Sequence, residues 1–330
     1  MAWSASLTPG SALGEKITFT PDTSAEGEYT VASFAAPRKG VYRFELMGSG
    51  GKRESAAGGT GGKTDGYLLL DMGQTVYVGA GGAGSAAFVA SQNAESLASV
   101  PKAALFFVAG AGGGGGKSAY YESDKKGAVT AGGHGGGVSG TQASGGGKGG
   151  TQEAGGAGYG DQSDGTLPVD GAYGAGGLGG SDNSYPVGTC TGGRGGDGYY
   201  GGGGGGANAS TNSATGINNG YAYGGGGGSG YVKTAALTVL GRTYASVTEQ
   251  GGGAASDGNG SVAVTYYARC ELPIRFDGAA VERLFFNGTE IGSLVYNGVK
   301  LFMRRWMRCL RYPGGQSACR AATQGSLLFQ

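Results

Sequence analysis

The sequence is poor in the residues that build catalytic and metal sites. Its 330 residues include one histidine, His134, and four cysteines, Cys190, Cys270, Cys309 and Cys319, without a Cys-x-x-Cys pair. The wide spacing of the cysteines argues against a zinc site and is typical of reduced thiols. A disulfide between Cys309 and Cys319 is left open. His134 has no carboxylate or cysteine near it in the sequence to complete a triad. We therefore predict a protein that is not an enzyme and needs no metal or cofactor.

Long apolar runs and an excess of one charge are also missing. Charged residues make up 14% of the chain and the net charge is +1, which fits neither an acidic disordered tail nor a basic nucleic-acid binder. No stretch approaches the roughly 18 apolar residues of a membrane span, and the N-terminus lacks the apolar core of a signal peptide. We expect a protein made in the cytoplasm, with no membrane span and no nucleic-acid partner.

Glycine is the residue that the chain has in excess. Of 79 glycines, 49 lie between Gly110 and Gly230, about two in every five residues of that stretch. Each glycine in a helix or strand interior costs roughly 0.5–1 kcal/mol relative to alanine, so neither element is favoured there. A flexible linker is one interpretation. The many interleaved tyrosines favour the other, a packed bundle of three-residue-per-turn polyglycine II helices.

The spacing of the glycines predicts which helices lie inside such a bundle. A Gly-Gly-X repeat places X on one outward edge, so residues 58–63, 132–137, 176–181 and 192–197 would form rim helices, with Arg194 and Asp197 facing outward. Unbroken glycine runs carry no side chain on any face, so other helices can surround them on all sides. The predicted glycine core is Gly112, Gly113, Gly114, Gly115, Gly116, Gly201, Gly202, Gly203, Gly204, Gly205, Gly206, Gly224, Gly225, Gly226, Gly227 and Gly228.

Strand-forming sequences flank the glycine-rich stretch on both sides. Two runs around Arg38-Lys39-Gly40 read as a hairpin, and two more around Met72-Gly73 as a second strand pair. Apolar strands follow at residues 104–110 and 260–268. The fold class is therefore mainly β with a central bundle of polyglycine II helices, little or no α-helix, and a β-framework that clamps the helix ends.

The order of these motifs resembles the glycine-rich domain of the anaplastic lymphoma kinase and leukocyte tyrosine kinase type. The matching segments are Val41–Gly51, Gly58–Lys63, Leu70–Gly84, Leu105–Gly116, Tyr199–Gly206 and Gly224–Val232. The resemblance covers about residues 28–268 and implies polyglycine II helices embraced by β-strands. Glycine-rich tips of phage tail fibres are similar. The kinase and membrane span of the receptor relatives have no counterpart here, so their signalling does not carry over.

The composition divides the chain into four parts. Residues 1–27 read as an N-terminal attachment arm, residues 28–268 as the glycine-rich domain, residues 269–302 as a β-repeat module and residues 303–330 as a basic tail. In the module, Asp277-Gly278, Asn287-Gly288 and Asn297-Gly298 recur every ten residues, which favours tight turns between short strands.

Two glycine motifs suggest a remote alternative, a nucleotide-binding enzyme. Residues 111–118 approach a P-loop with Lys117 and Ser118 in place, and residues 78–84 match Gly-x-Gly-x-x-Gly with Glu95 as a candidate ribose ligand. Both need a helix directly afterwards, and the first has no apolar-periodic sequence to build one. A calcium site at Asp161, Asp164 and Asp170 is likewise a minor alternative.

Four loops rich in Tyr, Ser, Asn and Asp interrupt the glycine tracts, at residues 118–126, 159–174, 181–192 and 208–224. This is the composition of antibody paratopes, although the same tyrosines could simply cap the bundle. The predicted receptor-binding residues are Tyr120, Tyr121, Tyr173, Tyr185, Tyr221 and Tyr223.

These features predict a phage or prophage tail-fibre adhesin located in the virion tail. Its partners would be a bacterial cell-surface receptor, either a glycan or an outer protein, and other tail proteins bound through the N-terminal arm or the C-terminal repeat. Self-association is left open. The alternative is a structural tail or surface assembly protein in which the bundle serves as a spacer.

Overall fold

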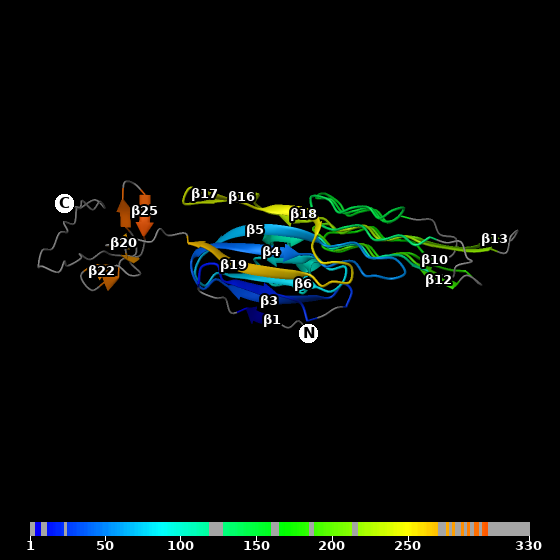
Figure 1. Cartoon of the computed structure of the whole chain (residues 1–330), viewed down its shortest axis with the longest axis horizontal. Coiled ribbons are helices and arrows are strands. Elements are labelled where there is room, and N and C mark those ends of the chain that lie inside the picture. Colours follow the sequence, from blue (N-terminus) through cyan, green and yellow to red (C-terminus); the bar gives the residue numbers. More distant parts are fainter. Residues whose placement is uncertain are drawn as a thin grey trace, which may run out of the picture. The chain divides into compact units, whose positions relative to one another are not determined.

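The chain forms two compact units, residues 1–268 and residues 269–330, shown in the computed structural model of Figure 1. The structure describes residues 4–7, 12–22, 25–118, 128–159, 165–184, 188–212 and 217–269, and the short strands between residues 275 and 302. The basic tail, residues 303–330, and the Asp-Gly and Asn-Gly pairs lie outside the described residues.

The first unit contains a framework of two β-sheets. One has six strands in the order β1 (Ser4–Leu7), β3 (Tyr29–Ala35), β6 (Thr75–Gly81), β7 (Ala87–Ala90), β8 (Leu105–Ala109) and β15 (Tyr231–Val232). The other has five, in the order β18 (Val247–Gly252), β5 (Gly62–Leu70), β4 (Gly40–Met47), β19 (Ser261–Arg269) and β2 (Lys16–Phe19). A hairpin of β16 (Ala236–Val239) and β17 (Arg242–Ala245) precedes β18. Two strands from the predicted attachment arm, β1 and β2, thus belong to these sheets.

The two sheets pack face to face around one apolar core. Alternate residues of each strand point inward, as in Val76 and Val78 of β6 and Phe44 and Leu46 of β4, all fully buried. Phe44 packs tilted against Phe107 of β8, with ring centroids 6.1 Å apart. The sandwich interior is the larger of the two main apolar clusters among the described residues.

The outer face of the six-stranded sheet carries a second apolar cluster. Two single 3₁₀ turns, η1 (Leu97–Ser99) and η2 (Lys102–Ala104), cover it, with Leu97 and Val100 buried against Phe88 and Val108. Tyrosines from the glycine-rich stretch pack at its border, which joins that stretch to the framework.

Both predicted hairpins of the framework are wrong. β3 pairs with β6, and β4 pairs with β5, so the links around residues 36–39 and 71–74 cross from one sheet to the other. The strands themselves lie where the sequence predicts them. Their pairing differs from the prediction because consecutive strands lie in opposite sheets of a sandwich. In that arrangement, both strands still turn an apolar face toward the shared core.

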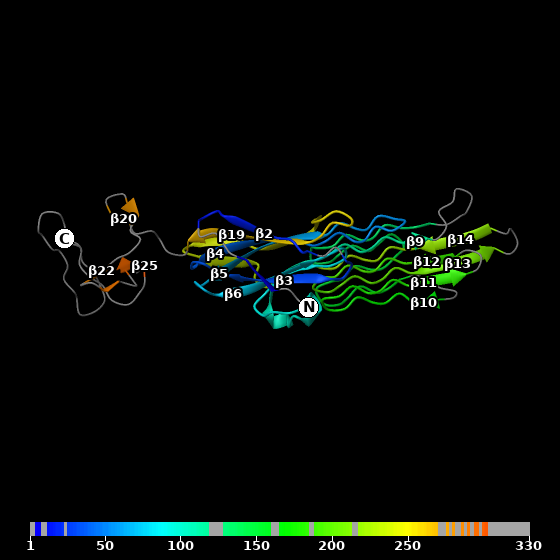
Figure 2. The same cartoon turned by 90° about the horizontal axis from the view of Figure 1, so that it is seen from below.

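The glycine-rich stretch forms a set of chain segments that lie side by side between the framework and a distal group of strands (Figure 2). All sixteen glycines of the predicted core are buried. A methyl group added at most of them would overlap a carbonyl of a neighbouring segment. The segments therefore pack backbone against backbone.

Hydrogen bonds within this set repeat every three residues. Along the run 111–116, N–H groups that are three residues apart donate to the same neighbouring segment, at 2.8 to 3.1 Å. Ala111 and Gly114 donate to the carbonyls of Asp197 and Arg194. Gly112 and Gly115 donate to those of Ser49 and Lys52, and Gly113 and Gly116 donate to those of Gly133 and Thr130. Gly225 and Gly228 follow the same spacing when they donate to Gly114 and Ala111. The run 111–116 therefore has three bonded faces.

The segment 192–197 is not a rim segment, which corrects the prediction from its Gly-Gly-X spacing. Asp197 is 2% exposed and the Arg194 side chain 19%. The two can be buried because the Arg194 guanidinium pairs with the Asp197 carboxylate at 2.7 Å. Mutual neutralisation removes most of the desolvation penalty that a single charge would carry.

The second unit contains three antiparallel strand pairs. They are β20 (Arg275–Phe276) with β21 (Ala279–Ala280), β22 (Phe285–Phe286) with β23 (Thr289–Glu290), and β24 (Leu294–Tyr296) with β25 (Val299–Phe302). Two residues separate the strands of each pair in the sequence. The recurrence every ten residues as a structural repeat stays a prediction.

The expected class, mainly β with little helix, is confirmed, since the described residues contain strands and two 3₁₀ turns but no α-helix. In that same part of the chain, no helix has the length and apolarity that crossing a bilayer requires.

Candidate functional site

Described residues from each of the four Tyr- and Asn-rich loops lie together at the end of the bundle distal to the framework (Figure 2). Their described parts form a four-stranded sheet in the order β10 (Gly165–Thr166), β11 (Ser181–Ser184), β12 (Gly188–Thr191) and β9 (Lys117–Ser118). A hairpin of β13 (Ala207–Asn212) and β14 (Ile217–Ala222) packs against this sheet. We call these six strands the tip. Segments up to about 100 residues apart in the sequence therefore share one small surface.

The tip has its own small core. Cys190, Ala207, Ala209 and Ala222 are buried together. Asp182 is fully buried, and one of its carboxylate oxygens accepts a hydrogen bond of 2.8 Å from the Ala209 backbone N–H. Small residues and a charge-assisted hydrogen bond let the sheet and the hairpin approach closely.

The structure brings two of the predicted tyrosines to the tip. Tyr221 lies in β14 opposite Asn208, and Tyr223 follows it, with its ring beside Gly145. Both side chains are partly buried, which fits one packed edge and one accessible edge. Part of each of the four loops lies outside the described residues, including residues 119–127 with Tyr120 and Tyr121 and residues 185–187 with Tyr185.

Tyr173 lies at the opposite end of the bundle, beside the framework. Its hydroxyl donates to the Val100 carbonyl at 2.7 Å, and its ring meets those of Tyr199 and Tyr200 edge to face. The Lys102 ammonium lies 4.9 Å from the Tyr173 ring centroid. Burial, reinforced by the neighbouring phenols, raises the pKa of Tyr173 to about 12. Tyr173 is therefore surrounded as a packing residue is, at the junction where the glycine bundle meets the framework.

A buried polar centre ties the bundle to the framework at that junction. The Asp197 carboxylate accepts from the Tyr29 hydroxyl at 2.8 Å, from Arg194 Nη2 at 2.7 Å and from the Gly176 N–H at 2.8 Å. Tyr29 belongs to β3, whereas the other partners belong to glycine segments. Burial, followed by the nearby Asp197 charge, raises the pKa of Tyr29 well above its usual value. No sequence motif marks this centre, since Tyr29, Gly176 and the Arg194–Asp197 pair come from segments far apart in the chain.

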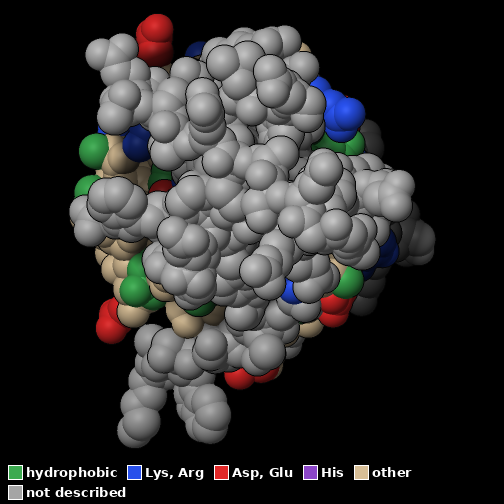
Figure 3. Space-filling view, turned by 90° about the vertical axis from the view of Figure 1, so that its left-hand side faces the viewer, with side chains coloured by type: hydrophobic (Ala, Val, Ile, Leu, Met, Phe, Trp, Pro, Cys, Tyr) green, Lys and Arg blue, Asp and Glu red, His purple; other side chains and the backbone are tan. Residues whose placement is uncertain are grey.

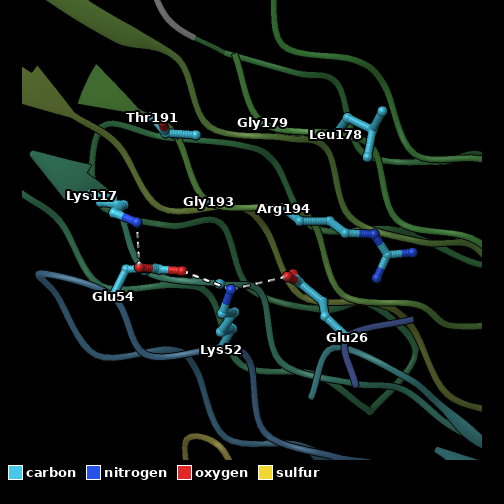
Figure 4. A pocket seen from close by; sticks show the side chains of 12 residues that line it. Glu26, Lys52, Glu54, Lys117, Leu178, Gly179, Thr191, Gly193 and Arg194 are labelled. Carbon is cyan, nitrogen blue, oxygen red and sulfur yellow. Dashed lines mark ion pairs between the residues drawn. The ribbon is translucent and has the colours of Figure 1, made fainter. Parts of the chain in front are cut away.

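A cavity of about 370 Å³ lies on the side of the bundle, next to the tip. Figure 4 shows a row of alternating charges along its wall, in which Lys52 stands between Glu54 and Glu26. Lys52 Nζ is 2.9 Å from Glu54 and 3.9 Å from Glu26, and Lys117 Nζ is 3.5 Å from Glu54. The hydrogen bond between Lys52 and Glu54 raises the pKa of the lysine and lowers that of the glutamate. No sequence motif marked this group.

The cavity has a backbone floor. Gly114, Gly115, Gly192 and Gly193 line it, and Leu178 is the one large apolar side chain among the described residues around it. Within the run 112–116, Gly114 is the least crowded position, since the nearest atom to an added Cβ would be the Arg194 backbone nitrogen at 3.3 Å, a tight contact but not an overlap. The corresponding positions on Gly113 and Gly115 overlap backbone.

Neither nucleotide motif has the local structure that it requires. Lys117 and Ser118 lie in strand β9, and the residues after the run 78–84 form strand β7. Among the described residues, neither place shows the helix N-terminus that holds a phosphate. Asp170 accepts a hydrogen bond from the Gly158 N–H at 2.7 Å, whereas Asp161 and Asp164 lie outside the described residues. Across the described ranges, no three His, Cys, Asp or Glu side chains are grouped as metal ligands would be.

Both basic and acidic side chains appear among the described residues that are visible in Figure 3. Comparison of the chain with known proteins finds no matching family model and no curated protein with significant similarity. Function must therefore be argued from the tip and the cavity themselves.

Proposed function

We propose that the glycine segments are polyglycine II helices and that they form a stiff support for the tip. The threefold spacing of the hydrogen bonds along residues 111–116 supports this assignment, because polyglycine II has three residues per turn and no internal hydrogen bonds. Every face of a helix is then bonded to a different neighbour. Bending one helix would break backbone hydrogen bonds with several others.

On this support, the chain is a non-enzymatic receptor-binding protein of the phage or prophage tail-fibre type. The observation that carries the proposal is the convergence of four Tyr- and Asn-rich loops on one tip, away from the framework. Its partner would be a receptor on a bacterial surface. Loops fixed at their bases lose less conformational entropy on binding than free ones, so a rigid tip gains affinity without added contact area.

Cell binding by the purified full chain tests this proposal. Labelled protein is incubated with a panel of bacterial strains, and the bound fraction is measured for wild type and variants. Alanine at Tyr120, Tyr121, Tyr185, Tyr221 and Tyr223 together should abolish binding. Tyr267→Ala is the control, because this tyrosine is 44% exposed on framework strand β19. Unchanged binding by the fivefold variant would refute receptor recognition through the loops.

Tyr173 provides a second, internal comparison. Because it packs at the junction and not at the tip, Tyr173→Ala should leave binding intact in protein that remains folded. Loss of binding at full folding would place the receptor surface at the framework end instead.

A structural tail or surface assembly protein is the second candidate. The three strand pairs of the second unit favour it, since short two-stranded pairs are marginal alone and gain stability from a partner. A chain that ends at Ala268 separates the two functions. An adhesin would still bind cells while losing incorporation into its assembly, whereas a spacer would bind cells in neither form.

A further inference from the structure

The side cavity next to the tip has the chemistry of a binding site, and its position links it to the recognition surface. Lys117 in β9 and Thr191 in β12 line it and are directly paired in the tip sheet. A molecule held in the cavity therefore contacts the same strands that carry two of the loops.

The shape of the cavity favours a small, flat ligand. Its volume of about 370 Å³ is at the lower end of the range for small-molecule sites and suits one or two sugar rings. Because the lining residues Gly114, Gly115, Gly192 and Gly193 present no side chains, a ring can lie against their peptide backbone. A folded protein element would not fit.

The charges select for a neutral ligand rich in hydroxyl groups. Lys52, Lys117, Glu26 and Glu54 sum to zero and are paired with one another. The remaining charged lining residue, Arg194, is paired with the buried Asp197. An anion or a cation would have to separate these pairs, which costs free energy without a compensating charge. Hydroxyl groups can accept from the ammonium groups and donate to the free lone pairs of the carboxylates while the pairs persist.

The lining also argues against a lipid or an aromatic ligand. Leu178 is 62% exposed at the edge, and the remaining described lining is polar or glycine backbone. Burial of a large apolar surface is therefore not available there.

We propose that this cavity binds a neutral sugar unit of a bacterial surface glycan. The inference rests on the receptor-binding function above, and it specifies the ligand class and the place where it docks. Glu54 accepts hydroxyl hydrogen bonds, Lys52 and Lys117 donate them, and Gly114 provides the contact surface.

Saturation-transfer NMR with the full chain tests the inference. The probes are glucose, galactose, rhamnose and N-acetylglucosamine, with glucuronate and inorganic phosphate as charged comparisons. At least one neutral sugar should bind saturably, with a Kd on the order of 1 mM. No saturable binding of a neutral sugar, or tighter binding of glucuronate or phosphate, would overturn the proposal.

Variants then locate the site. Gly114→Leu fills the cavity, and Glu54→Gln keeps its shape but removes an anionic acceptor; each should weaken sugar binding by about tenfold or more, the size expected for a lost charge-assisted hydrogen bond. Lys148→Ala is the matched control, an exposed lysine on another glycine segment, and should bind as wild type does. Unchanged binding in Glu54→Gln and in folded Gly114→Leu would place the sugar elsewhere and refute the assignment. If Gly114→Leu does not fold, Glu54→Gln alone decides.

The cell-binding assay separates this inference from the proposed function. If the tip tyrosines are needed for cell binding but no sugar binds the cavity, the inference fails and the function stands. If sugars bind the cavity but neither tip nor cavity variants alter cell binding, the proposed function fails instead.

Discussion

Alanine substitutions at two adjacent glycines provide the sharpest test of backbone-to-backbone packing. Gly113 and Gly114 lie in the same run and are both buried. A Cβ on Gly113 would overlap the Gly225 carbonyl and stand 2.6 Å from the Gly226 oxygen, whereas a Cβ on Gly114 has its nearest neighbour at 3.3 Å. The two variants therefore share composition and helix but differ in the space available.

The expected difference in stability is several kcal/mol. To accommodate Gly113→Ala, the neighbouring segment must move, which strains bonds such as Gly113 N–H to the Gly133 carbonyl at 2.9 Å. Overpacking costs about 1–3 kcal/mol, and each buried group left without its hydrogen bond adds about 1–3 kcal/mol. Gly114→Ala requires the Arg194 backbone to shift by only a few tenths of an ångström and also restricts the unfolded chain, so its net effect should stay within about 1 kcal/mol.

Urea-induced unfolding of both variants, followed by circular dichroism, measures the difference. Gly113→Ala should lower the free energy of unfolding by about 3 kcal/mol or more, and Gly114→Ala should nearly match wild type. Equal effects at the two positions would show that the segments do not pack as described.

Three further predictions concern the buried groups. Asp197→Asn leaves the Arg194 guanidinium without its counter-charge and should lower the free energy of unfolding by about 3–5 kcal/mol in the same assay. Asp257→Asn is the control, because its pair with Arg53 is exposed and 3.9 Å long, and it should lower the free energy of unfolding by under about 1 kcal/mol. Equal losses of stability would contradict a central role for the Asp197 centre. Because the folded pKa of Tyr29 lies above the usual 10.0, its stabilising contribution is complete below pH 10 and is lost as pH rises further. Tyr29→Phe should make the alkaline decline of unfolding free energy shallower by up to about 1.4 kcal/mol per pH unit, and an unchanged slope would argue against this shift. Cys190 is fully buried, so Cys190→Ala should leave the fast thiol titre with an aromatic disulfide reagent unchanged, and a drop of one thiol would show that it is accessible.

The sequence alone predicts the kinds of elements well. β-Branched and aromatic runs at residues 104–110 and 260–268 are strands β8 and β19, because their alternating apolar residues need a core. Unbroken glycine runs are buried, since only residues without side chains tolerate neighbours on every face. Strand-forming runs and unbroken glycine runs are each defined by a short stretch of sequence, so the sequence alone is enough to identify them.

The partners of each element could not be predicted. The links around Lys39 and Gly73 look like hairpin turns, yet each crosses the core edge to the other sheet. The outward placement of Arg194 failed for a related reason: spacing shows which residues share a face, but not which neighbour covers that face. The Asp197 centre and the row of charges at Lys52 depend on such covering segments, so no motif marks them.

The threefold repeat along residues 111–116 also constrains how the reach of the tip can change. Under the proposed polyglycine II assignment, inserting or deleting three residues in every segment of the bundle returns each later side chain to its former direction and shifts the tip by about 9 Å per unit. An insertion of one or two residues would rotate every outward side chain toward a neighbouring backbone that has no room for it. The lengths of the glycine segments should therefore vary in steps of three residues, whereas the loops can vary by any number of residues.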